Sequence, residues 1–199
     1  MKMSLLGSAI FCGTITSAVS AAVTSYSDFS FWTEDVVASG SSVATETFNS
    51  YNGFYPTLTG STGGITWTAE AYNGLSFNNA LFSVNQANVA ATFTFTPGVQ
   101  AVGGNIFGTD INNLSIANAK IKVTLADGTA YVGYSSSAAD FVGFVSDGAA
   151  ISSMSILATK PGVNVWVSAD NLYFGVTAVP APGAIGLLGL AGLVSRRRR

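Results

Sequence analysis

The sequence contains no histidine, and Cys12 is its only cysteine. Without imidazole, the chain cannot build a Ser-His-Asp triad, a Cys-His dyad or a zinc site that includes histidine. A single thiol near the start of the chain also leaves nothing for an internal disulfide. We therefore expect a domain that is held together by its hydrophobic core alone.

Charged residues make up only 9% of the chain, and they are unevenly placed. Lys2 and a terminal run of arginines account for five of the eight basic residues, and arginine occurs nowhere else. Between residues 23 and 178, three lysines (Lys120, Lys122 and Lys160) stand against ten acidic residues, a net charge of about −7. A surface of this sign repels phosphate backbones, so we expect no binding of nucleic acid.

The last 21 residues combine a proline-containing motif, an uncharged apolar run and an arginine cluster. Residues 183–195 carry no charge that would oppose entry into hydrocarbon, and the arginines after them favour a cytoplasmic terminus. As a helix this run would span only about 20 Å, short of a hydrocarbon core of roughly 30 Å, which suits a transient membrane stop. The motif is Val179, Pro180, Ala181 and Pro182, and the cluster is Arg196, Arg197, Arg198 and Arg199.

The first 22 residues are typical of a secretory signal peptide. Lys2 supplies the positive start, and Leu5 to Val19 is apolar apart from scattered serine and threonine. Small residues follow, and they place the predicted cleavage after Ala21 or Ala22.

Together the two ends resemble those of the PEP-CTERM family of exported bacterial proteins. Pro180 and Pro182 match the two prolines of the family's tag, the helix and arginines match as well, and Ala181 stands where the family has glutamate. The resemblance implies that an exosortase, a membrane-embedded cysteine transpeptidase, recognises the tag and removes the helix. It also implies an exported protein of the cell surface or extracellular matrix of a Gram-negative-type bacterium, held briefly in the inner membrane.

Residues 23–178 are predicted to form one all-β domain, because Gly, Ser, Thr, Asn, Val and Phe dominate there and the polar residues that helices need are scarce. We expect no helix in this region. Nine or ten short strands between turn residues favour an antiparallel two-sheet β-sandwich of the jelly-roll or carbohydrate-binding-module type, with a closed barrel as the alternative. The expected strands are 43–48, 65–69, 89–96, 99–107, 121–126, 129–134, 141–145, 154–158, 163–167 and 172–176.

The clearest local unit is a hairpin from Ile121 to Tyr134. Asp127 and Gly128 stand between two alternating runs, which predicts a two-residue type I′ turn. That turn would set Val123 opposite Val132 and Ile121 opposite Tyr134 on one apolar face.

Two kinds of binding site follow from the residues. Glu46, in an early strand, and Asp170, which opens the last strand, are candidate ligands of a structural calcium ion that would join the two, since calcium takes carboxylate and carbonyl oxygens. Asp170 would alternatively form only a turn. Tyr51, Tyr55, Trp67 and Tyr72 lie in a stretch rich in glycine and asparagine and are candidates for stacking on sugars; the alternative is that they serve the core.

These observations favour a non-catalytic exported surface or matrix protein that associates with exopolysaccharide or biofilm. A specific carbohydrate-binding module is the second hypothesis. A polysaccharide-active enzyme, which would need two carboxylates across a cleft, is the third.

Overall fold

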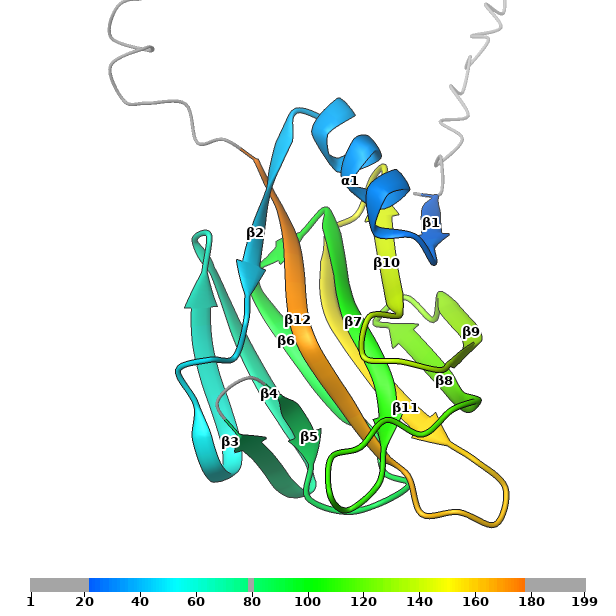
Figure 1. Ribbon diagram of the computed structural model, residues 1–199. Helices are drawn as coiled ribbons and strands as arrows, with labels where there is room; N and C mark the ends of the chain where they lie inside the picture. The colour runs from blue at the N-terminus through cyan, green and yellow to red at the C-terminus, as the bar shows by residue number, and fades with distance from the viewer. Residues whose placement is uncertain (1–21, 79–80, 178–199) are drawn as a thin grey trace, which may run out of the picture.

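The computed structural model describes residues 22–78 and 81–177, and this part of the chain is almost entirely β (Figure 1). All-β architecture is therefore confirmed. The described residues form one helix, α1 (Phe29–Ala38), and twelve strands: β1 (Val23–Tyr26), β2 (Ser41–Glu46), β3 (Asn52–Thr62), β4 (Ile65–Asn78), β5 (Phe82–Val84), β6 (Ala91–Val99), β7 (Ala101–Thr109), β8 (Ala119–Leu125), β9 (Ala130–Ser135), β10 (Phe141–Ser146), β11 (Ile151–Thr159) and β12 (Trp166–Thr177).

All twelve strands belong to one antiparallel hydrogen-bonded sheet in the order β1-β10-β7-β12-β5-β4-β6-β11-β8-β9, with β2 added on β12 and β3 on β4. The sheet curls until it is nearly closed, because β7 lies against β8, β9 and β11 across the interior. The sequence predicted two sheets, but β5 pairs with both β12 and β4 and so links the two halves.

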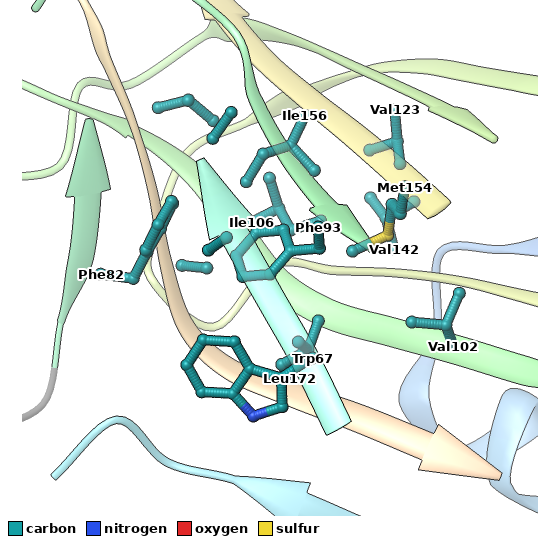
Figure 2. Packing of buried hydrophobic residues seen from close by; sticks show 14 of the residues in the cluster. Trp67, Phe82, Phe93, Val102, Ile106, Val123, Val142, Met154, Ile156 and Leu172 are labelled. Carbon is teal, nitrogen blue, oxygen red and sulfur yellow. The ribbon is translucent and has the colours of Figure 1, made fainter. Parts of the chain in front are cut away.

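The curled sheet encloses a single large core. Figure 2 shows side chains from β4 to β8 and from β10 to β12 that meet in one interior, among them Trp67, Phe82 and Phe93. Trp67, Phe82 and Phe93 are fully buried, and the ring centroids of Phe82 and Phe93 are 5.0 Å apart. Burial of a large apolar side chain contributes about 1.5–3 kcal/mol, so this cluster is a main source of stability in a domain without disulfides.

Helix α1 contradicts the expectation that residues 23–178 contain no helix. Asp28 caps it, since its carboxylate accepts hydrogen bonds from the backbone N–H of Ser30 (2.7 Å) and Phe31 (3.2 Å). Trp32 and Val36, one turn apart, are both fully buried against the sheet. Tertiary packing of this short apolar face outweighs the weak helix propensity of the segment.

A glycine makes room for the helix on the sheet. A Cβ atom at Gly143 of β10 would lie 2.7 Å from the Trp32 ring. The absence of this atom lets Trp32 pack on β10 and donate a hydrogen bond from Nε1 to the backbone oxygen of Phe144 at 3.1 Å.

The β8–β9 hairpin is where the sequence predicted it, but its register is shifted by one residue. Gly128 N–H donates to Leu125 O at 3.0 Å and Leu125 N–H donates to Thr129 O at 2.8 Å, so the loop has three residues. Only Gly128 has a positive φ, of 89°, which fits a type I turn followed by a bulge rather than type I′.

The shift reverses the face on which the β9 side chains lie. Val132 now pairs with Lys122 and Tyr134 with Lys120, and these two β9 residues are 54% and 71% exposed. The β8 half of the prediction is confirmed, because Ile121, Val123 and Leu125 are buried.

Several other strand limits differ from expectation. β1, β3 and β5 were not predicted, and β6 continues through a cis Thr96–Pro97 bond to Val99 instead of ending before the proline. The separate strands expected at 163–167 and 172–176 form one strand, β12, with an irregular register between Ala169 and Leu172.

Both sorting segments lie outside the described residues, apart from Ala22. This applies to residues 1–21 with Ala21, to the 179–182 motif, to the apolar run 183–195 and to the arginines 196–199. Within 22–78 and 81–177, no helix has the length and apolar character needed to cross a membrane.

Gly128→Val should lower the free energy of unfolding by about 1–3 kcal/mol, because a β-branched residue is strained at positive φ. No atom lies within 4 Å of a Cβ built at this position, so the loss would come from the backbone rather than from a clash. Chemical denaturation measures it. Ala126→Val, in the same loop but at ordinary φ, is the control, and equal losses in the two variants would contradict this account of the turn.

Candidate functional site

An open cleft of about 690 Å³ lies where the outer face of β8 and β9 meets the loop between β11 and β12. Its volume is within the roughly 300–1,000 Å³ that is usual for small-molecule sites. The loop between β11 and β12 lies at the end of the molecule away from α1, and β8 and β9 lie at its side (Figure 1). Its lining consists of Asn88, Asn118, Lys120, Tyr134 and the segment 159–164.

Three neighbouring strands supply one row of cleft residues. Lys120 of β8 is the register partner of Tyr134 on β9 and of Thr159 on β11. Side chains directly opposite each other in antiparallel strands have Cβ atoms about 4.5–5.5 Å apart. Tyr134, which is 71% exposed, therefore presents its ring beside the Lys120 side chain.

Local hydrogen bonds order the loops around this row. Val163 N–H donates to Lys160 O at 3.1 Å, with Gly162 at φ 73°, which makes a tight turn. The Lys160 ammonium donates to Ala117 O at 2.8 Å and so joins this turn to the start of β8.

Asn88 holds the other wall of the cleft. Its backbone N–H donates to Val165 O at 2.7 Å, and its side-chain oxygen accepts from Val165 N–H at 3.3 Å. Its amide nitrogen donates to Asn164 Oδ1 at 3.4 Å, and both asparagines line the cleft. The wall thus presents side-chain amides, which both donate and accept hydrogen bonds.

The cleft differs in charge from the rest of the domain. Two of the three lysines between residues 23 and 178 line it, Lys122 follows on the same face of β8, and none of the ten acidic residues lines it. A positive cleft in a domain of net charge about −7 focuses the local potential on anions.

The sequence-predicted sugar residues do not form a common surface. Trp67 is fully buried and donates from Nε1 to Glu46 Oε2 at 3.2 Å, so it has no exposed ring face and is a core residue. Tyr51 and Tyr55 pack against the core, with ring centroids 5.6 and 5.4 Å from that of Phe77. Tyr72 alone is open to solvent, with 70% of its surface exposed.

Glu46, a candidate calcium ligand, has neutral partners of its own. Its carboxylate accepts from Phe48 N–H (2.9 Å), Thr62 Oγ1 (3.0 Å) and Trp67 Nε1 (3.2 Å). These bonds occupy both oxygens and satisfy a carboxylate that is only 9% exposed. Burial and the nearby Glu46 carboxylate raise the pKa of Tyr51.

Asp170, the other calcium candidate, lies in the irregular part of β12. Burial raises the pKa of its carboxyl group, and its charge adds to the burial that raises the pKa of Tyr173. Leu172, two residues after Asp170, is the register partner of Glu46 on β2, so the two candidates lie on neighbouring strands. No group of three or more acidic, cysteine or histidine side chains suited to a metal occurs within the described ranges. Calcium binding stays a prediction.

Sequence reasoning missed the cleft. Its residues come from four separate segments, and the expected hairpin register placed Tyr134 on the apolar face. The lysines were counted only toward net charge. Their confinement to residues 120–160 of an otherwise acidic domain was a usable signal.

No protein-family model matches the chain, and a search of curated proteins likewise found no match. The site is therefore interpreted from its own chemistry.

Glu46→Ala should lower the free energy of unfolding by about 2–4 kcal/mol, because it leaves the buried donors of Phe48 N–H and Trp67 Nε1 unpaired. The matched control is Glu70→Ala, at an exposed position of β4. Thermal melts of wild type and variant with and without EDTA test calcium at the same time. Destabilisation that does not depend on EDTA supports the hydrogen-bond account, and a wild-type Tm that falls on chelation supports calcium.

Proposed function

We propose that this chain is a non-catalytic exported protein of the cell surface or extracellular matrix that associates with polysaccharide. The observation that carries the proposal is the cleft, in which an exposed tyrosine ring lies beside asparagine amides and lysines. An aromatic face stacks on a pyranose ring, and amides match sugar hydroxyl groups as both donors and acceptors. A specific carbohydrate-binding module is the form of this function that the cleft favours.

The chemistry of the cleft supports binding rather than turnover. Glycosidases of the common types need two carboxylates on either side of the scissile bond, and this cleft is lined by none. The histidine-dependent nucleophilic mechanisms are excluded by composition.

The finer description of the fold belongs to the same proposal. We infer that the curled sheet acts as a β-sandwich, with β2, β12, β7, β10 and β1 facing β3, β4, β6, β11, β8 and β9. Facing ring contacts support this, since Phe95 of β6 and Phe174 of β12 have centroids 5.5 Å apart and an interplanar angle of 76°. Such sandwiches are a common architecture of exported glycan-binding domains.

Export rests on the resemblance of the chain's two ends to PEP-CTERM proteins, and one contact bears on the first cleavage. Ala22 N–H donates to Asp147 Oδ1 at 2.6 Å, and Asp147 N–H donates to Ala22 O at 3.1 Å. Cleavage after Ala21 would turn that N–H into an ammonium group already placed on a carboxylate. Cleavage after Ala22 would discard both contacts, so we favour Ala22 as the first mature residue.

Mass spectrometry of the protein released from producing cells should find a chain that begins at Ala22 and lacks residues 183–199. An exosortase-type transpeptidase would account for the second cut. Replacing the four arginines with serine should reduce that processing, because it removes the topological stop. A released protein with an intact C-terminus would contradict the sorting proposal.

The purified protein should bind oligosaccharides on a panel of soluble glycans and release no new reducing ends from them. Tyr134→Ala should weaken binding by about fivefold or more, in line with the loss of one stacking contact. Tyr72→Ala is the matched control, because Tyr72 is equally exposed but lies outside the cleft. Retained binding in Tyr134→Ala together with loss in Tyr72→Ala would move the site to the sequence-predicted residue, and no binding at all would refute the function.

A further inference from the structure

We propose that the cleft selects acidic polysaccharides, with chains of uronic acids as its ligand class. This inference rests on the proposed glycan-binding function and adds the chemistry that distinguishes one glycan from another.

The domain has three lysines, and two of them line this cleft. Lys120 and Lys160 line the cleft, and Lys122 is two residues along the same exposed face of β8. No carboxylate lines this cleft. The ammonium groups are therefore available for charges that a ligand brings.

The row across the strands couples sugar stacking to charge recognition. Lys120 is the direct partner of Tyr134 on one side and of Thr159 on the other, and Lys160 follows Thr159. A pyranose ring that stacks on Tyr134 would hold its substituents beside Lys120. A uronic acid carries a carboxylate directly on that ring, so one sugar unit could meet both side chains.

The second lysine lies where the next unit of a polymer could reach it. Lys160 comes from the end of β11, one strand beyond β8, and its bond to Ala117 O uses only one of its three protons. The remaining protons can bind a carboxylate. Asn118 and Asn164 line the same cleft and can serve the uncharged hydroxyl groups.

Other anionic polymers fit this arrangement less well. Nucleic acids bind through many phosphate contacts, usually with arginine, and the domain offers three lysines and no arginine against a net charge of about −7. Uronic acid polymers combine a modest charge density with a stacking face and many hydroxyl groups. The lysines of the cleft can bind the carboxylates, its tyrosine can stack on the sugar face, and its asparagines can bind the hydroxyl groups.

The test compares acidic polymers with their own uncharged esters. Polygalacturonate and alginate would be measured against highly methyl-esterified pectin and a fully esterified alginate by isothermal titration, at low salt and at about 0.5 M NaCl. We expect the free acids to bind at least about fivefold more tightly than the esters at low salt, and the difference to shrink at high salt.

Variants that remove the charge of a single lysine show which lysines produce the preference for the free acid over the ester. Lys120→Gln and Lys160→Gln should each reduce the preference for the free acid over the ester by about twofold to fivefold, as expected for exposed ion pairs. Lys122→Gln is the control, because it makes the same change on the same strand outside the cleft. Thermal melts of each variant exclude loss of fold, which matters for Lys160 because its ammonium joins two loops.

The outcomes distinguish selectivity for acidic glycans from the proposed glycan-binding function on which it rests. Equal binding of acids and esters, or a preference that survives both cleft variants, overturns the acidic selectivity and leaves glycan binding standing. Absence of binding to every polymer overturns both. Inorganic polyphosphate is the probe of charge alone, and binding of polyphosphate as tight as that of uronans would overturn the assignment to sugars.

Discussion

Strand β12 is the element on which the closed sheet depends. It pairs with β7 along most of its length on one edge, and on the other edge first with β5 and then with β2. In the strand order it is the only link between the β1-β10-β7 half and the half that runs from β5 to β9. Because β12 comes last among the described strands, the enclosed core is complete only when the end of the domain has docked.

The irregular register of β12 lets one strand serve two partners. Asp170 and Asn171 lie between the β5 and β2 contacts and together stand opposite the single residue Asn105 of β7, and this one extra residue bends the strand at that point. Asn171 and Tyr173 both donate to Asn105 Oδ1, at 3.3 and 2.9 Å, which fixes the bend to β7. Asp170 thus lies in the bulge of β12, and its role as a calcium ligand stays a prediction.

Features set by local patterns could be predicted from the sequence, and features set by packing could not. Alternation identified the buried face of β8, and Asp127-Gly128 located its turn, but the choice between a two-residue and a three-residue loop depends on contacts such as Ala126 N–H to Ser153 O. Helix α1 depends on the space that Gly143 leaves for Trp32, which no local signal reveals. The four segments that line the cleft come together only through the strand order. The uneven placement of the lysines could therefore be read from the sequence, but the cleft itself could not be predicted.

The placement of the cleft fits a domain that is attached to something at its C-terminal end. β12 begins at Trp166, next to the loop that forms the cleft, and ends at Thr177 beside α1 and β2 (Figure 1). Twelve residues of strand span roughly 35–40 Å, so the cleft and Thr177 lie toward opposite ends of β12. A tag that follows residue 177 would hold the domain by the end with the helix and direct the lysines and Tyr134 outward. If the domain binds an acidic matrix polymer, as we propose, the cleft must face away from the point of attachment. The rest of the domain has a net negative charge and would repel such a polymer.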